Sequence, residues 1–442
     1  MKKISFIIFI AALFCSCDPK LQKLTIIGEN SSNVQAMETS KAEYEQKKPN
    51  IKLDFKPNTY EEAFNKSNQD FANQTGLYDI VLQYNFSLAS YAKNNYVYDL
   101  KELKSLSKNT DYSFESDIFP FLWKEASYYY NDPKKPDPAN IKPLSYPFAG
   151  NAMLLVYNKE LFNDPAQKKA YFEKYHEELN VPQDLPTFYK VAAFFTQPDK
   201  NLYGLALEGA ATGWMYYEWC SFLQGYNAKV LDKSQGWGGN ANTPILIDSK
   251  EAIDGTNYYK SLKPFTAGNF FTVDGVEQRN ILKKGNVAMG IIWSDYCYGL
   301  INKDDGAFDQ RFGFLPTPGS KSLTGGGSFF INRKSKNPSE AFDYVLFVMS
   351  KEEQVKLVKK GLCSPRKSVY DDPSVQSVPY VPALKVSMNR AEYMLEAGPD
   401  GDFISTTITK YIQKIWNGEL STETGLKAAK KEIAEGRAKF FN

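Results

Sequence analysis

The chain has 442 residues, of which 43% are hydrophobic and 24% charged, and this composition excludes a disordered, collagen-like or coiled-coil protein. Its 53 basic and 51 acidic residues nearly cancel, so no overall charge attracts it to nucleic acid or anionic lipid. A single histidine excludes multi-histidine metal sites, while aromatic residues reach 15%. We therefore expect a globular protein of about two to three domains, with no metal, cofactor or nucleic-acid partner.

The N-terminus has the pattern of an export signal. Two lysines precede residues 4–14, an apolar segment too short to span a bilayer. Residues 1–17 resemble a bacterial lipoprotein signal, in which the cysteine after the cleavage point is lipidated, and Cys17 fits that position. Cleavage of a plain secretory signal is the alternative. We expect an exported protein of the cell envelope, anchored through Cys17 on the periplasmic or extracellular side of a membrane.

The cysteines beyond this segment are Cys220, Cys297 and Cys363. An odd number cannot close completely into internal disulfides, and the spacing does not suit a metal site. We expect all three to be small buried side chains, although one pair could form a disulfide.

Strands and helices alternate at the start of the mature chain. Apolar periodicity predicts strands at 24–28, 51–56 and 78–83, and helices at 33–47 and 60–74, the second ending at Gly76. This order predicts a parallel sheet covered on both faces by helices. Ligands of such sheets bind beyond the carboxyl ends of the strands. The candidates there are Glu29, Asn30, Tyr84 and Asn85.

The rest of the chain continues the alternation. A helix is expected to begin at Pro338 with Asn337 as its cap, and another after Ser350. An apolar stripe from Leu426 to Phe440 predicts a docked terminal helix. The remaining predicted strands are 152–157, 203–208, 287–293 and 312–315, and the remaining predicted helices are 158–162, 188–196 and 213–225.

Five segments then carry a family resemblance. They are YDIVLQYNFSLASYAKNNYVYDL at 78–100, YPFAGNAMLLVYNKELF at 146–162, residues 182–204, LKKGNVAMGIIW at 282–293, and residues 326–366 with SEAFDYVLFVMSKEEQ and GLCSPR. In this order the segments resemble bacterial extracellular solute-binding proteins of the maltose-binding-protein type. One departure is Asn95–Tyr96, where the family usually has Gly-Leu.

The resemblance implies an α/β fold of the two-lobed periplasmic-binding-protein type (type II), with several chain crossovers and a ligand cleft between the lobes. Carried onto this sequence, the first lobe is 18–147 with 322–366, and the second is 148–321 with 367–442. In the family the lobes close on a ligand, and the closed form is recognised by the membrane subunits of an ABC importer. The resemblance thus implies a monomeric binding protein that is not an enzyme.

Sugar binding requires amides or carboxylates for the hydroxyls and aromatic faces for the C–H faces of the ring. The resemblance points to Asn151, and to Trp293 and Asp295 at the end of a strand. Trp214, Tyr217 and Glu218 are spaced to share one helical face, although such stripes are more often core.

Further candidates come from glycine-rich and charged segments. Gly326, Gly327 and Ser328 lack the lysine of a phosphate loop and suit close backbone approach to a ligand. Trp237 could reach the rim of the cleft, and Arg366 could bind an anion or pair across the lobes.

The sequence therefore predicts a lipid-anchored receptor that delivers a small solute, most simply a sugar or oligosaccharide, to an ABC importer. The first alternative is an anionic or polyamine-like solute bound by the same fold. The others are an envelope glycoside hydrolase with two carboxylates and a glycan-binding lipoprotein of helical repeats. The sequence names neither the solute nor the transporter.

Overall fold

The computed structural model describes residues 21–130, 141–211, 213–232, 241–303, 306–392 and 398–441. Within these ranges a nine-stranded sheet runs in the order β2-β1-β3-β10-β6-β8-β7, with β9 beside β6 and β11 beside β10. The short pair β4 and β5 forms a separate ribbon. The strands are β1 (Gln22–Glu29), β2 (Ile51–Asn58), β3 (Ile80–Tyr84), β4 (Tyr128–Tyr130), β5 (Ile141–Pro143), β6 (Pro147–Asn158), β7 (Tyr203–Ala206), β8 (Val287–Trp293), β9 (Phe312–Pro316), β10 (Ser322–Ile331) and β11 (Ala391–Glu392).

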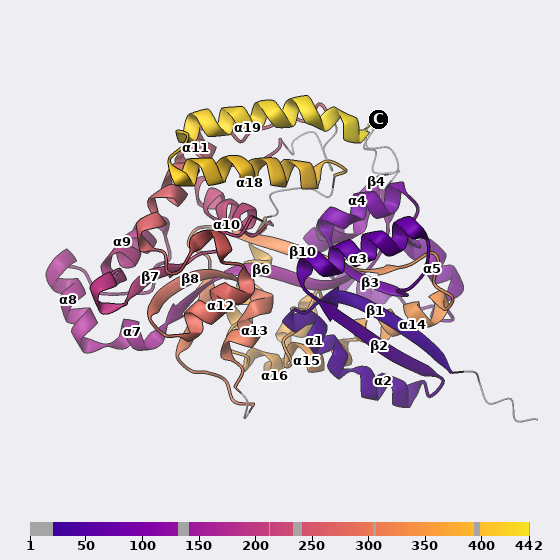
Figure 1. Cartoon of the computed structure of the whole chain (residues 1–442). Coiled ribbons are helices and arrows are strands. Elements are labelled where there is room, and N and C mark those ends of the chain that lie inside the picture. Colours follow the sequence, from indigo (N-terminus) through magenta and orange to yellow (C-terminus); the bar gives the residue numbers. More distant parts are fainter. Residues whose placement is uncertain are drawn as a thin grey trace, which may run out of the picture.

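Helices cover both faces of the sheet (Figure 1). They are α1 (Ser32–Thr39), α2 (Lys41–Lys47), α3 (Tyr60–Asn73), α4 (Asn85–Lys93), α5 (Leu100–Leu106), α6 (Pro120–Leu122), α7 (Lys159–Asn163), α8 (Pro165–Tyr175), α9 (Leu185–Phe195), α10 (Trp214–Leu223), α11 (Lys250–Ser261), α12 (Gly275–Lys283), α13 (Ser294–Ile301), α14 (Pro338–Met349), α15 (Lys351–Val358), α16 (Pro373–Gln376), α17 (Val381–Asn389), α18 (Gly401–Asn417) and α19 (Thr422–Gly436).

The first three strands confirm the predicted parallel arrangement. Ile26 of β1 lies opposite Phe55 of β2 and Ile80 of β3, and both pairings are parallel. The connecting helices follow their apolar stripes, so Ala63 and Phe71 of α3 are buried. The carboxyl ends of β1 and β3 therefore open at the same edge of the sheet.

Two long antiparallel strands join this parallel group to the strands β7, β8 and β9. The first half of β6 pairs with β10, and its second half, from Met153 onward, pairs with β8 and β9. At its own far end β10 pairs with β3. Figure 1 shows the two strands crossing the middle of the molecule. The chain thus passes between two groups of elements at β6 and again at β10.

Three local predictions were wrong in detail. The helix expected over 33–47 is interrupted at Ser40, whose hydroxyl donates to the Met37 carbonyl at 2.7 Å. Helix α3 ends at Asn73, and its C-cap Gln74 adopts a left-handed backbone (φ 53°) before Gly76 is reached. Asn337 does not cap α14, because its Oδ1 accepts a hydrogen bond from Gln22 at 3.1 Å instead.

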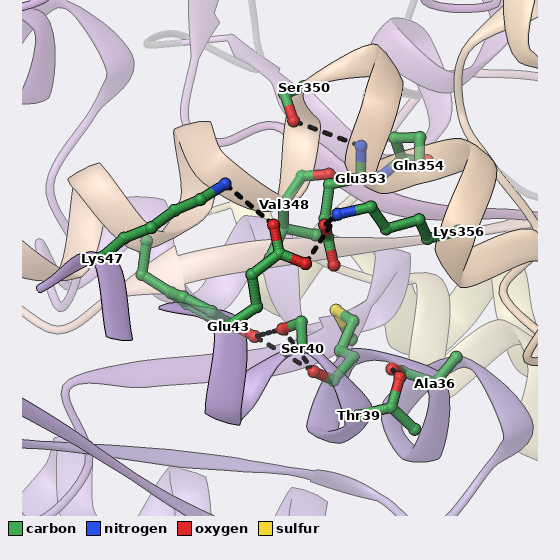
Figure 2. Close-up of polar contacts among 12 residues, drawn as sticks. Ala36, Thr39, Ser40, Glu43, Lys47, Val348, Ser350, Glu353, Gln354 and Lys356 are labelled. Carbon is green, nitrogen blue, oxygen red and sulfur yellow. Dashed lines mark hydrogen bonds and ion pairs between the residues drawn. The ribbon is translucent and has the colours of Figure 1, made fainter. Parts of the chain in front are cut away.

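Helices α1 and α2 dock on α14 and α15 through a small polar network (Figure 2). Lys356 Nζ lies 2.6 Å from Glu43 Oε2 and 3.3 Å from Glu353 Oε2. Glu43 also pairs with Lys47 at 2.8 Å. Ser350 accepts from the Glu353 N–H at 3.4 Å, which confirms the predicted start of α15. The network fixes the N-terminal helices against a segment more than 300 residues later.

The C-terminal helices α18 and α19 form a hairpin that lies across α10 and α11 (Figure 1). Helix α19 buries Leu426, Ala429 and Ile433, which confirms a docked terminal helix. The hairpin is held at both ends of α18. Trp416 stacks on Phe270 at a centroid distance of 4.0 Å, and a buried Arg437 pairs with Asp400 at 2.7 Å.

Cys220, Cys297 and Cys363 are buried and belong to no disulfide of the described residues, as expected of small core side chains. In the part of the chain that the structure describes, none of the helices has the length and apolar character needed to cross a bilayer.

Candidate ligand-binding site

A cavity of about 260 Å³ lies where the ends of β1, β3 and β8 meet the middle of β6 and β10. Helices α3, α10, α13 and α18 complete its walls. The strands bring their residues here because parallel strands end at a common edge and β6 and β10 cross that edge. Nine of the predicted site residues line this cavity: Glu29, Tyr84, Asn85, Asn151, Trp214, Tyr217, Trp293, Asp295 and Gly326.

Glu29 is held by two tyrosine hydroxyls. Tyr84 donates to Glu29 Oε2 at 2.6 Å, and Tyr296 donates to Oε1 at 2.7 Å. Burial raises the pKa of Glu29, and the nearby charges of Glu61 and Asp274 raise it further, while the two hydroxyls oppose the shift. The side chain is 8% exposed, and that exposed part faces the cavity.

Asp295 belongs to an amide network. Asn151 Nδ2 donates to Asp295 Oδ2 at 3.1 Å, and Asn33 Nδ2 donates to Asn151 Oδ1 at 3.1 Å. The Oδ1 of Asn33 accepts from the Cys363 N–H at 2.7 Å, which fixes its orientation. The other oxygen of Asp295, Oδ1, is buried and has no hydrogen-bond partner among the described residues. Burial, and then the charge of Glu29, raise the pKa of Asp295 to about 8.

Aromatic rings form the apolar walls. Trp293 meets Tyr217 edge to face at 5.3 Å, and Trp214 meets Tyr296 in the same way at 5.7 Å. Gly325 passes close over the Trp293 ring, where an added Cβ would lie 3.1 Å from ring atoms. The absence of a side chain at this position keeps the ring edge open to the cavity.

Sequence reasoning missed two walls of the cavity. Helix α3 contributes Tyr60, Glu61, Phe64 and Asn65, and helix α18 contributes Asp402, Ser405, Thr406 and Thr409. The α18 residues are spaced three and four apart, so they share one helical face. That polar stripe in an otherwise isoleucine-rich helix was a signal available in the sequence. The remaining lining residues that were missed are Ala211, Gly213 and Tyr296, whereas Gly325 belongs to the glycine segment that the sequence placed at the cleft.

Four predicted residues lie outside the cavity. Asn30 is exposed and its side chain accepts from Gln35 at 2.9 Å. Glu218 is completely buried. Gly327 packs against Phe148, and the Ser328 hydroxyl donates to the Ala126 carbonyl. Trp237 lies outside the described residues.

Arg366 does not reach the cavity either. Its Nε donates to Asp117 Oδ2 at 2.8 Å, and its Nη1 donates to the Met349 carbonyl at 2.7 Å. Asp117 also accepts from the N–H of Ser368 at 2.8 Å. Asp117, Met349 and Arg366 all fall in the stretches predicted for the first lobe, so the guanidinium makes neither the anion contact nor the pairing across the lobes that the sequence left open.

Chemically, the cavity offers aromatic faces beside carboxyl and amide groups. Its described lining contains Glu29, Glu61, Asp295 and Asp402, and it contains no lysine, arginine or histidine. A search of the described residues for three or more His, Cys, Asp or Glu side chains placed to hold a metal ion found none. Aromatic faces next to carboxyl and amide groups suit a small organic solute with hydrogen-bond donors.

The fold and this cavity define an extracellular binding protein of the two-lobed periplasmic type, as the sequence predicted. Comparison with known proteins identifies the family. The chain belongs to the bacterial extracellular solute-binding proteins, whose family model matches residues 39–383.

Solved structures share the fold over nearly the whole chain. A solute-binding protein of an ABC transporter from Agrobacterium radiobacter K84, in complex with ribitol, superposes with a TM-score of 0.77 at 20% identity, covering 94% of this chain and 99% of that one. Maltose-bound MalE3 of T. maritima gives 0.75 at 19% identity, with 93% and 98% covered. The GacH receptor of Streptomyces glaucescens, studied with acarbose, gives 0.75 at 20% identity, with 94% and 98% covered.

A curated relative gives a shorter match. A probable ABC transporter-binding protein from Deinococcus radiodurans is 27% identical over 173 residues. The match spans 36% of this chain and 41% of the relative's length.

Proposed function

We propose that this protein is a receptor that captures a sugar or polyol in the cavity and delivers it to an ABC importer. The observation that carries the proposal is one cavity that combines tryptophan and tyrosine rings with carboxyl and amide groups. Aromatic rings cover the C–H faces of such solutes, and planar polar groups bind their hydroxyls. Structural relatives bound to ribitol, maltose and acarbose support the same class of solute.

The mechanism is closure of two lobes on the solute. We assign the first lobe to 18–147 with 322–366 and the second to 148–321 with 367–442, because β6 and β10 cross between the two groups of strands. A ligand shifts this equilibrium only if it binds the closed form better than the open one. The importer subunits then distinguish the loaded receptor by its closed shape. The protein acts in this proposal as a monomer and as a carrier, without catalysis.

Membrane attachment is the second part of the proposal. The chain is exported, cleaved before Cys17 and held to a membrane by a lipid on that cysteine. The lysine-led apolar segment at 4–14 and the small residue before Cys17 support this. Metabolic labelling with a fatty acid analogue tests it, because a Cys17→Ser variant should lose the label and the membrane association together.

Isothermal titration of the chain without its signal tests the solute class. We expect saturable heat with at least one of ribitol, mannitol, tagatose or maltose, and none with inorganic phosphate. Trp214→Ala should then weaken affinity by about 1–3 kcal/mol, because a half-buried wall of the cavity is lost.

Trp123→Ala is the matched control, since Trp123 is also half-buried but stacks on Tyr128 outside the cavity. Equal affinity losses in the two variants would remove Trp214 from the site. Absence of binding to every sugar and polyol would overturn the receptor proposal.

A further inference from the structure

The charged side chains in the described lining of the cavity are all acidic. Four carboxyl groups line it, from Glu29 on β1, Glu61 on α3, Asp295 on α13 and Asp402 on α18, and the described lining supplies no basic side chain. Neutral hydroxyls can hydrogen-bond to carboxylates, but they leave the charge in place. Glu29 and Asp295 are buried, so their ionised forms are costly unless each takes up a proton or a cation lies beside it.

Asp295 gives an independent indication. It is 3% exposed, it faces the cavity, and its Oδ1 has no hydrogen-bond partner in the described part of the chain. Asn151 and Asn33 hold the opposite oxygen, Oδ2, at 3.1 and 3.5 Å. The amides therefore fix the carboxyl group through Oδ2, and Oδ1 is left as a buried acceptor without a partner among the described residues. A donor on a bound solute would satisfy it.

We propose that the preferred solute is an amino sugar or amino polyol whose ammonium group binds at Asp295 and Glu29, while its carbon skeleton lies against the aromatic walls. The inference rests on the proposed function and specifies its substrate class. Two kinds of group that line the cavity suit an ammonium ion. Carboxylates form charge-assisted hydrogen bonds with it, and aromatic faces such as those of Trp293 and Tyr217 attract it as well.

Proton linkage follows from the same geometry. Because Asp295 has a pKa of about 8 without ligand, it is mostly protonated at about pH 6.5. An ammonium ion beside it favours the ionised form, so binding should release a proton. A neutral sugar has no such effect. The titratable groups that face Asp295 and Glu29 are Tyr84 on β3, Tyr60 and Glu61 on α3, Glu208 after β7, Tyr296 and Cys297 on α13, Asp274 before α12, Cys363 after α15 and Asp402 on α18.

Calorimetry with matched pairs of solutes tests the proposal. The pairs are sorbitol and glucamine, glucose and glucosamine, and mannose and mannosamine, each differing only by an ammonium group in place of a hydroxyl. At about pH 6.5 we expect the charged member of the pair that fits best to bind at least about tenfold more tightly, equivalent to about 1.4 kcal/mol. Titrations in buffers of different ionisation enthalpy should show release of about one proton for that member and about none for its neutral partner.

Isosteric variants locate the ammonium site. Asp295→Asn keeps the shape of the side chain and one acceptor oxygen but removes the charge. It should reduce the preference for the charged member to within about threefold. Asp343→Asn is the control, because Asp343 is a surface residue paired with Lys48 and should leave the preference unchanged. Thermal unfolding of each variant confirms that it is folded.

The outcomes separate the two proposals. Equal affinity for both members of a pair, with no proton released, would overturn the amino-solute inference and leave the sugar receptor standing. An intact preference in folded Asp295→Asn would also overturn it. Binding of putrescine with no binding of any sugar or polyol, charged or neutral, would overturn both.

Discussion

Two pairs of buried carboxyl groups in this protein have different surroundings. Glu29 and Asp295 line the cavity, and tyrosine hydroxyls and asparagine amides hold them. Glu208 and Glu218 are completely buried, and neither oxygen of Glu208 has a hydrogen-bond partner among the described residues. Burial raises the pKa of both glutamates well above the usual range, and the charge of Glu218 adds to the shift at Glu208.

The contrast shows that a raised pKa does not by itself identify a ligand site. The pKa values of both pairs are raised, and burial is the main cause in each. Only Glu29 and Asp295 combine that burial with donors that fix their orientation and with an opening to a cavity. We therefore regard Glu208 and Glu218, the sealed pair, as a core feature that must stay protonated. Glu29 and Asp295, the cavity pair, are carboxyl groups that a ligand can ionise.

The largest expected effect concerns the sealed pair. Because Glu218 has a raised pKa in the folded state, its contribution to stability is complete at low pH and is lost as the pH rises above its unfolded value of about 4.3. The slope is at most about 1.4 kcal/mol per pH unit for each extra proton held by the folded state. Glu218→Gln removes one such group, so its unfolding free energy should fall less steeply between about pH 5 and 8. Urea denaturation across that range measures the slope.

The control for this comparison is Asp295→Asn, which should also flatten the slope between about pH 4 and 8. The two variants should differ when a bound solute is present. Ligand should change the slope of the Glu218→Gln protein, which keeps Asp295, and should change that of Asp295→Asn less. Identical responses of both variants to ligand would break the distinction between the pairs.

A smaller effect is expected from the hydroxyl groups that hold Glu29. Tyr296→Phe removes the donor to Glu29 Oε1, so stability should fall by about 1–2 kcal/mol. Because the lost hydrogen bond had lowered the pKa of Glu29, that pKa should rise further. Carboxyl chemical shifts followed by NMR during a pH titration measure it.

Tyr258→Phe provides the matched control, because Tyr258 donates to the Leu185 carbonyl at 2.6 Å, away from the cavity. It should cost similar stability and leave the titration of Glu29 unchanged. A shift of Glu29 in both variants would mean that the change reflects general loosening of the structure.

Apolar periodicity predicted strands at the positions of β1, β2, β3, β6, β7, β8 and β9, but not at β4, β5, β10 or β11, and the candidate residues included nine that line the cavity. Strand 287–293 matches its predicted bounds, and the residues that follow strand ends, such as Glu29, Tyr84 and Asp295, reach the cavity. These predictions succeeded because periodicity reports burial, and strand ends meet at one edge.

The failures have a common physical cause, which is contact between distant parts of the chain. Arg366 is bound by Asp117, 249 positions earlier, and no local pattern shows that partner. Helix α18 was not among the predicted helices, and its place over the cavity depends on packing against α10 and Phe270. Glu218 shares a helix with Trp214 and Tyr217, yet one step around that helix turns it into the core.

The smallest expected effect comes from a third set of carboxylates, which shows what a cation does for an acidic pair. Lys356 bridges Glu43 and Glu353 (Figure 2), and it lowers the pKa of Glu43, whereas burial still raises that of Glu353. Lys356→Met should cost less than about 1 kcal/mol, since Lys356 is exposed and Glu43 is half-buried although Glu353 is buried, and most of the cost should disappear in about 1 M salt. Lys360→Met, at another exposed lysine, is the control for removing a surface charge, and urea denaturation compares the two.

A salt-independent cost above about 2 kcal/mol would mean that the bridge acts through packing and is no guide to the cavity. A small, salt-sensitive cost would give a lower limit for the stabilisation that a cation contributes between two carboxylates in this fold. A cation beside the buried Asp295 should contribute more, because charges interact more strongly where water is excluded.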